Sequence, residues 1–317
     1  MTRKTQARRA DLRPTLTAAE NLPREGQTFE GESVLVRYMN FVKLPHTVFA
    51  LPFALLGMVY ASHRTAVTAG TAALVVIAFT AARFAAMGFN RIVDREVDAK
   101  NPRTRNRELP SGRMSVKAAG AAVAAGGAVF LLAAGLLNRV CFYLSPLALA
   151  WILAYSYTKR WTHWSHVWLG AALAIAPAGG YLAVAGQWSD PMWTLAVLAL
   201  AVAAWVGGFD VFYALQDEDF DRRHGLKSAI VVLGRSRAIL AGKLAHGVTI
   251  ALLVWFGVGA GFGVAYYAGL AVAAVLLVWE HRLVHPEDLS RLDAAFFTMN
   301  GVMSIVVFLG ALVDRLL

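Results

Sequence analysis

"GFNRIVDREVDAKNPRTRNRELPSG" occupies residues 88–112 and follows the apolar run "TAVTAGTAALVVIAFTAARFAAM" at 65–87. That run is long enough to cross a bilayer as a helix. Three polar side chains then follow at intervals of four: Asn90, Asp94 and Asp98. Steps of four advance by about 40° around an α-helix, so the three side chains share one stripe. Because carboxylates are costly near lipid, this stripe at the end of a predicted membrane helix indicates a functional site.

The composition of the whole chain is that of a membrane protein. Its 317 residues are 58% hydrophobic, with a mean hydropathy of +0.53, whereas soluble domains are about half apolar. Strand-like alternation is absent, so we predict an all-α polytopic membrane protein rather than a barrel. The single cysteine, Cys141, excludes an intramolecular disulfide.

The apolar runs predict about nine transmembrane helices around a central cavity that opens to the cytoplasmic side and to the bilayer. The predicted spans are 45–63, 66–89, 115–137, 140–157, 166–186, 192–216, 236–257, 262–280 and 294–313.

The net charge of +10 is concentrated in alternate connections between these spans. Lys and Arg gather at 89–114, 158–165, 217–237 and 281–293, whereas the other connections are short and nearly uncharged. The positive-inside rule therefore places the N-terminus and the basic loops in the cytoplasm and the C-terminus outside. Membrane topology accounts for the positive charge, so we expect no nucleic-acid partner.

The chain begins with a polar segment of mixed charge. No apolar stretch of a secretory signal follows its basic start, and its acidic residues argue against an organellar transit peptide. We predict a disordered cytoplasmic tail at 1–34 and a transmembrane domain at 35–317.

A second acidic series, "DVFYALQDEDFD", occupies residues 210–221. Offsets of three, seven and eleven place four of its side chains on one helical stripe: Asp210, Tyr213, Asp217 and Asp221. Glu218 and Asp219 fall elsewhere around the helix, and we expect both to be solvated.

The two acidic series form a weak internal repeat. "GFN" at 88–90 opens the first and "GFD" at 208–210 opens the second, and a basic loop follows each. Duplicated halves are common in membrane folds, and here they would bring both stripes to one cytoplasmic cavity. One such stripe could be an ordinary solvated helix end, but two extended stripes favour a site.

The residue types suggest which ligands this site binds. Carboxylate and amide oxygens suit Mg²⁺, which keeps several waters and bridges phosphates. Thiol clusters and paired histidines typical of zinc are absent, and the eight histidines show no ligand spacing. Basic residues beside both stripes would hold phosphate oxygens. The sequence therefore predicts a site for magnesium and a diphosphate.

These motifs resemble those of the UbiA superfamily of intramembrane prenyltransferases. "NRIVDREVD" fits its NxxxDxxxD motif, "DVFYALQDEDFD" fits DxxYxxxDxxxD, and "YSYTKRWTHW" resembles its YxxxK loop. "NRELPSG" resembles the segment after the first motif. "KLPHTVFALPFALLG" and "DLSRLDAAFFTMNG" resemble the ends of the 4-hydroxybenzoate polyprenyltransferase group. The resemblance spans roughly residues 35–315.

The resemblance implies a membrane enzyme of the bacterial plasma membrane that uses Mg²⁺, a polyprenyl diphosphate and an aromatic acid. The diphosphate departs from an allylic carbon with cationic character, and the electron-rich ring attacks that carbon. Metal and fixed cations stabilise charge that develops on a leaving group. The implied magnesium ligands are Asp94, Asp98, Asp217 and Asp221.

The resemblance also implies roles for other residues. Asn90, Asp210 and Tyr213 would be catalytic. Asn90 would lie near the acceptor and the diphosphate, and Asp210 near the second metal or the acceptor hydroxyl. Arg107 would clamp the diphosphate, although Arg103 and Arg105 could do the same. The remaining substrate-binding candidates are Tyr155 and Lys159 for the diphosphate and Lys43 for an acceptor carboxylate.

Several alternatives stay open. The acceptor of a quinone pathway could be 4-hydroxybenzoate or 1,4-dihydroxy-6-naphthoate of a menaquinone route, because both are ring carboxylates with a phenolic hydroxyl. A cation-coupled transporter would carry ionisable groups near the midplane of several spans. Here such groups cluster at span ends among arginines, which favours the enzyme. A structural membrane subunit would leave the repeated stripes unexplained. The sequence does not predict prenyl chain length or oligomeric state.

Overall fold

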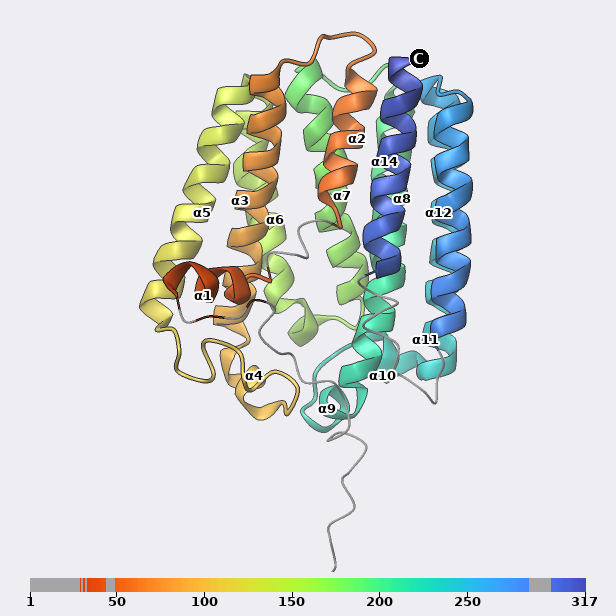
Figure 1. Cartoon of the computed structure of the whole chain (residues 1–317). Helices are drawn as coiled ribbons and strands as arrows, with labels where there is room; N and C mark the ends of the chain where they lie inside the picture. Colours follow the sequence, from red (N-terminus) through yellow and green to blue (C-terminus); the bar gives the residue numbers. More distant parts are fainter. Residues whose placement is uncertain (1–28, 30, 32, 44–48, 285–297) are drawn as a thin grey trace, which may run out of the picture.

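The computed structural model describes residues 29, 31, 33–43, 49–284 and 298–317. Most of the predicted tail at 1–34 therefore lies outside the described residues, so the tail and the domain boundary remain predictions. Within the described ranges every regular element is a helix, and the long helices stand side by side in one bundle (Figure 1). The fold class is all-α, as predicted.

The long helices match the predicted spans closely. They are α3 (Ala69–Val93), α5 (Val116–Leu137), α6 (Arg139–Trp161), α7 (Ser165–Ala185), α8 (Met192–Ala214), α11 (Arg235–Ala260) and α12 (Val264–Leu283).

Seven stretches of helix are long and apolar enough to cross a membrane, and in one of them α8 is counted together with the short helices after it. Two shorter helices, α2 (Leu51–Ala61) and α14 (Asn300–Leu316), stand in the same bundle at the predicted first and ninth spans (Figure 1). Residues 44–48 and 285–297 before them are outside the described residues, so the count of nine stays a prediction.

Short helices gather at one end of the bundle, which we call the polar end and define as residues 94–115, 162–164 and 215–234. This end carries α4 (Arg95–Lys100), η3 (Leu215–Asp217), α9 (Glu218–Arg223) and α10 (Ala229–Leu233). The C-terminus lies at the opposite end, and α1 (Val34–Phe41) runs crosswise to the long helices (Figure 1). The sequence did not predict α1.

Local signals set the helix ends. The side chains of Thr68, Ser115 and Asn138 accept a hydrogen bond from the backbone N–H three residues on, which caps α3, α5 and α6. Helices α7 and α11 end at Gly186 and Gly261, whose φ angles of 64° and 70° suit glycine. Each of these long helices therefore begins or ends next to a residue that can cap it.

Helix α2 links helices from the middle and the end of the chain within the bundle. Helix α2 packs against α7 and α14, so it joins the first and last parts of the chain. Glycine permits this contact: a Cβ on Gly57 would lie 2.0 Å from the Pro177 carbonyl oxygen, and one on Gly180 would lie 1.9 Å from that of Ala54. The two backbones touch directly, as at small-residue interfaces of other membrane helices.

A buried polar network ties four helices together on the other side of the bundle. Trp205 Nε1 of α8 donates to Asn300 Oδ1 of α14 at 2.7 Å, and Asn300 Nδ2 donates to Glu280 Oε1 of α12 at 2.8 Å. His246 of α11 approaches the Trp205 carbonyl at 3.2 Å and Glu280 at 3.7 Å. All four side chains are almost fully buried. The network fixes α8 against its neighbours, and it gives Asn300 the partners that sequence reasoning could not supply.

Gly180→Ala should destabilise the bundle, because its new methyl group meets the α2 backbone rather than a movable side chain. The neighbouring substitution Gly179→Ala is a matched control, since a Cβ there has no neighbour within 4 Å among the described atoms. We expect a loss of about 1–3 kcal/mol for the first and no loss for the second. Thermal unfolding in detergent measures both, and equal midpoints would contradict the close contact.

Asn300→Leu should also lower the unfolding midpoint, because it leaves the Trp205 N–H and the Glu280 carboxyl buried without this partner. Such losses typically cost about 1–3 kcal/mol. Ser304→Ala on the same helix is the control, since among the described atoms Ser304 Oγ donates to Gly301 O of its own helix. A midpoint for Asn300→Leu no lower than that of Ser304→Ala would show that the network contributes little.

Candidate active site

One large cavity of about 750 Å³ runs from the polar end into the bundle between α3, α6, α7 and α8. Its deeper walls are apolar, with Phe79, Leu144, Trp151 and Leu173 among them, and it extends to Trp188 near the opposite end. All eleven predicted site residues line this cavity: Lys43, Asn90, Asp94, Asp98, Arg107, Tyr155, Lys159, Asp210, Tyr213, Asp217 and Asp221. The structure thus brings the two acidic series to one place, while their individual roles remain predictions.

Each acidic series crosses a break in its helix. Helix α3 ends at Val93 and α4 begins at Arg95, with Asp94 between them at φ −92° and ψ 3°. In the second series Asp217 ends η3 and precedes α9 at φ −103° and ψ 2°. The same bridge-region conformation at matching motif positions supports the internal repeat. The break turns each chain across the cavity mouth, so neither stripe is one straight helix.

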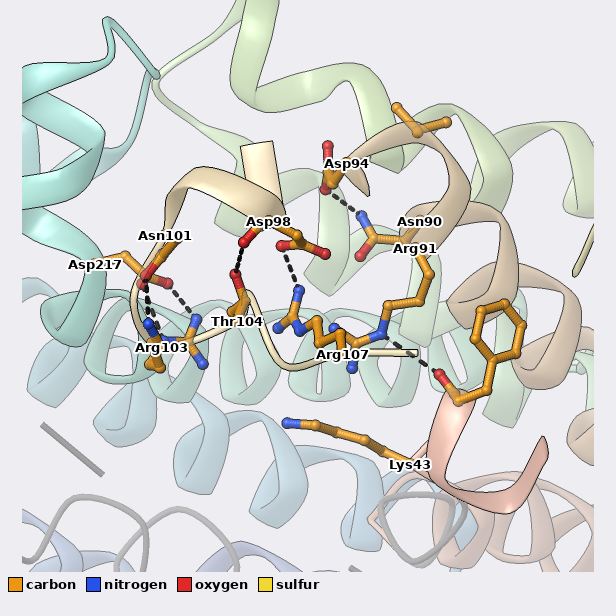
Figure 2. Close-up of polar contacts among 12 residues, drawn as sticks. Lys43, Asn90, Arg91, Asp94, Asp98, Asn101, Arg103, Thr104, Arg107 and Asp217 are labelled. Atoms are coloured by element: carbon orange, nitrogen blue, oxygen red, sulfur yellow. Dashed lines mark hydrogen bonds and ion pairs between the residues drawn. The ribbon is translucent and has the colours of Figure 1, made fainter. Parts of the chain in front are cut away.

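A loop from the first half reaches the carboxylate of Asp217 in the second half (Figure 2). Arg103 grips Asp217 with two nitrogens, Nε at 3.0 Å from Oδ1 and Nη2 at 2.5 Å from Oδ2. Asn101 Nδ2 also donates to Asp217 Oδ1 at 3.0 Å. Thr104 Oγ1 anchors this loop on the Asp98 carbonyl oxygen at 3.1 Å. We call residues 101–107 the arginine loop.

The other three carboxylates also pair with cations. Arg107 Nη1 lies 2.6 Å from Asp98 Oδ1, and Lys159 Nζ lies 3.6 Å from Asp221 Oδ2. Arg160 Nη2 lies 3.5 Å from Asp94 Oδ1. With the pair of Arg103 and Asp217, four acids face four cations across the polar end. We call these eight side chains the charged layer.

Of the three arginines that the sequence left as alternative clamps, two belong to this layer. Arg103 is buried and Arg107 is partly buried, whereas Arg105 is exposed. Arg103 Nη1 also donates to Tyr213 Oη at 3.0 Å, and Lys43 Nζ lies 3.5 Å from the same oxygen. The structure therefore favours Arg103 and Arg107 over Arg105 as groups that can meet a ligand in the cavity.

The burial of Glu218 corrects one expectation. Asp219 is exposed, as predicted, but Glu218 is buried and forms ion pairs with Arg222 and Arg235. The arginines that follow along the chain fold back onto its carboxylate. Glu218 thus stabilises the turn after the second series, and it does not line the cavity.

The charged layer suits magnesium by the chemistry of its donors. Among the described residues no three His, Cys, Asp or Glu side chains gather as one metal-binding group, and each of the four carboxylates pairs with a cation. Two carboxylate oxygens, Asp98 Oδ2 and Asp221 Oδ2, are buried without a hydrogen-bond donor. Burial and the nearby Asp98 carboxylate raise the pKa of Asp94 to about 6. These oxygens would gain from a hard cation, so the residues present fit Mg²⁺.

Two cavity residues escaped the sequence analysis. Arg83 of α3 lines the cavity about two helical turns deeper than Asn90, and no described acid lies within ion-pair distance of it. His166 of α7 is buried, and its Nδ1 lies 2.6 Å from Asp210 Oδ2. A cation inside the apolar run 65–87 was a visible signal for Arg83. His166 gave no signal, because its partner lies 44 residues away.

The sequence profile of the UbiA prenyltransferase family matches residues 50–302 of this chain. The chain belongs to this family. Among its relatives, the 4-hydroxybenzoate octaprenyltransferase of Chromohalobacter salexigens is 33% identical over 76% of this chain and 79% of the relative. That of Sodalis glossinidius is 33% identical over 78% of this chain and 83% of the relative.

Solved structures of UbiA homologues share the fold. The apo structure of a homologue from Aeropyrum pernix K1 superposes with a TM-score of 0.77 at 34% identity, over 85% of this chain and 98% of that one. A homologue from Archaeoglobus fulgidus bound to GPP and Mg²⁺ gives a TM-score of 0.64 at 18% identity, over 89% and 100%. The chain is therefore an integral membrane prenyltransferase of the UbiA type.

In this UbiA-family enzyme, Asp217→Asn should reduce prenyl transfer by about 100-fold or more, because it removes a charge from the layer while keeping the side-chain shape. Asp219→Asn is the matched control, two residues away and exposed, and should change the rate less than about two-fold. Transfer of a radiolabelled prenyl group in nanodiscs measures both. An equal loss in the two variants would show that position in the charged layer does not decide activity.

Proposed function

We propose that the chain transfers a polyprenyl group from a polyprenyl diphosphate to the ring of an aromatic hydroxy acid, with 4-hydroxybenzoate as the acceptor, in a Mg²⁺-dependent reaction of quinone synthesis. The observation that carries the proposal is the position of the charged layer at the mouth of a cavity whose deeper walls are largely apolar. A polyprenyl diphosphate matches this cavity, because its charged head group would lie at the mouth and its long apolar tail along the deeper walls.

The proposed diphosphate site uses groups from both halves of the bundle. Magnesium held by Asp94, Asp98, Asp217 and Asp221 would neutralise the diphosphate and stabilise the charge on the leaving group. Arg103, Arg107 and Lys159 offer donors at the same level, and arginine can grip phosphate oxygens with two nitrogens at once. Tyr155, in the cavity wall, faces this layer. Related proteins bound to GPP or DMAPP with Mg²⁺ support the choice of ligands.

The prenyl tail would occupy the deeper cavity. Leu144, Leu147 and Trp151 line that part and are also substantially exposed, as expected of a wall that opens sideways to lipid. A polyprenyl chain could then enter from the bilayer and stay partly within it. The apolar walls would also exclude water from the reacting carbon, which protects a cationic centre from hydrolysis.

Arg83 supports an acceptor that carries a carboxylate. A guanidinium without an acidic partner, deep in an apolar cavity, is costly unless a ligand supplies the negative charge. Asn90 lies between Arg83 and Asp94 along α3, and Asp210 lines the same cavity, so both could bind the acceptor hydroxyl. Arg83 is thus a stronger candidate for the acceptor carboxylate than Lys43, which contacts Tyr213 at the polar end. The names of the relatives support 4-hydroxybenzoate.

The membrane orientation is part of the proposal. The positive-inside rule favours the polar end as the cytoplasmic one, because the arginine loop and the basic residues after the second series lie there. The N-terminus would then be cytoplasmic, and the membrane would be a bacterial plasma membrane, as the organisms of the relatives suggest.

Purified protein in nanodiscs should form a C-prenylated acid from geranyl diphosphate and 4-hydroxybenzoate, and excess EDTA should abolish the reaction. A parallel assay with 1,4-dihydroxy-6-naphthoate tests the other phenolic carboxylate that fits the same groups. Full turnover in EDTA would exclude the metal, and an O-prenylated product would mean that the ring is not the nucleophile.

Arg83→Gln should raise the KM for 4-hydroxybenzoate by about ten-fold or more, the scale of one lost charge-assisted hydrogen bond. It should barely change the KM for methyl 4-hydroxybenzoate, which lacks the carboxylate. Arg139→Gln, at an exposed site at the opposite end of the bundle, is the control. If the variant affected the acid and the ester equally, Arg83 would not bind the carboxylate.

A further inference from the structure

We propose that His166 is the positioning partner of Asp210 and that the pair accepts the hydroxyl proton of the aromatic acceptor. The inference rests on the proposed function, since it needs a phenolic substrate in the cavity. It assigns a task to a histidine outside both acidic motifs.

The contact between the two side chains is short and sheltered. His166 Nδ1 lies 2.6 Å from Asp210 Oδ2, between the start of α7 and the last third of α8. The His166 side chain is 3% exposed and that of Asp210 is 15% exposed. Both residues line the cavity. The more exposed carboxylate can therefore meet a ligand in the cavity, while the almost fully buried imidazole holds it by the hydrogen bond.

The hydrogen-bonding chemistry assigns the proton. An ionised carboxylate can only accept, so the bond requires hydrogen on His166 Nδ1. His166 Nε2 is buried and has no hydrogen-bond partner among the described atoms. The ring can thus hold one proton toward Asp210 and has a second nitrogen available for another. A hydrogen bond from the imidazole N–H fixes the direction of the carboxylate, and a carboxylate held in this way is placed to take a proton from a neighbouring hydroxyl.

Asp210 differs from the four carboxylates of the charged layer. Each of those pairs with an arginine or lysine, whereas Asp210 pairs with a histidine, whose ring has two nitrogens that can each carry hydrogen. Asp210 lies seven residues before Asp217, about 10 Å deeper along the helix. This depth suits the ring of the acceptor rather than the diphosphate.

Close packing of α7 and α8 fixes the positions of His166 and Asp210 relative to each other. On α8, Gly208 and Phe212 contact His246, which belongs to the buried network of Trp205, Glu280 and Asn300. On α7, Gly170 lies against the Ala203 carbonyl so closely that a Cβ would come within 2.3 Å of its oxygen. These contacts fix the rotation of both helices, and with it the direction of the Asp210 carboxylate.

The proposed step balances as follows. The C–O bond of the allylic diphosphate breaks, and its electron pair leaves with the diphosphate. A ring carbon ortho to the hydroxyl forms the new C–C bond. As the hydroxyl proton passes to Asp210, oxygen donates electrons to the ring, and the hydrogen bond from His166 keeps the carboxylate turned toward that hydroxyl. The ring regains aromaticity when its C–H proton is lost and Asp210 returns the hydroxyl proton to the oxygen, so that one proton in total is released with the diphosphate.

The test compares His166→Gln with the unaltered chain across acceptors of increasing hydroxyl acidity. Single-turnover transfer from geranyl diphosphate with Mg²⁺ is measured for 4-hydroxybenzoate and for its mono- and difluorinated ring analogues. General acid–base groups typically contribute about 100-fold or more, so we expect a deficit of about 10- to 100-fold with 4-hydroxybenzoate. The deficit should shrink with the fluorinated acids, whose hydroxyl ionises without help.

Controls separate this role from a structural one. His63→Gln, at an exposed site at the other end of the bundle, should match the unaltered chain with every acceptor. Mg²⁺-dependent binding of geranyl diphosphate should be unchanged in His166→Gln, which reports an intact fold, and Asp210→Asn should show the same trend across acceptors. If His166→Gln does not fold, the Asp210→Asn series decides the outcome.

The outcomes are distinct. A deficit that stays constant from the least to the most acidic acceptor would overturn the role of the pair and leave the proposed function intact. Equal rates for His166→Gln and the unaltered chain would do the same. Absence of product from the unaltered chain with every phenolic acid would overturn the proposed function and the inference that rests on it.

Discussion

Charge balance at the mouth of the cavity is the constraint on which the rest of the structure depends. Four carboxylates and four cations meet there at the edge of a low-dielectric interior, where an isolated charge would be costly. Magnesium and a diphosphate also nearly neutralise each other. On the proposed function, these ligands would therefore exchange partners with the charged layer, acids to the metal and cations to the phosphates, without burying net charge. A layer of acids alone would repel itself whenever the site held no metal.

The helices that carry the charged layer must keep fixed positions relative to one another within the lipid. Hydrophobic burial does little between helices in a bilayer, so close packing and buried hydrogen bonds provide the specificity. On one side α2 and α7 touch backbone to backbone at Gly57 and Gly180. On the other side the Trp205–Asn300–Glu280 network joins α8 to α12 and α14. Both devices converge on α7 and α8, the two helices that carry His166 and Asp210.

The sequence predicted what local periodicity can encode. Long apolar runs gave the helices, and four-residue spacing placed Asn90, Asp94 and Asp98 at one cavity. The sequence could not predict contacts between distant segments. Nothing in the residue spacing shows that Arg103 would form an ion pair with Asp217 or that Arg235 would cover Glu218. The breaks at Asp94 and Asp217 were also missed, because a four-residue pattern fits a continuous helix and a kinked one equally well. Arg83 could be seen in the sequence as a charge inside an apolar run, but only the structure shows that it lines the cavity.

The order of groups along the cavity explains why two such different reactants could meet at one carbon. On the proposed function, the charged layer fixes the diphosphate at the mouth, and Arg83 fixes the acceptor carboxylate about two turns deeper on the same helix. The acceptor ring then lies between these anchors, beside Asn90 and Asp210. The allylic carbon is bonded directly to a diphosphate oxygen. It would also lie between the charged layer and Arg83, because the prenyl tail must run from the cavity mouth along the deeper apolar walls. On this proposal, two anchors at fixed heights convert binding energy into the alignment of donor and ring, and Asp210 in the same cavity would select the ring substituent that loses its proton.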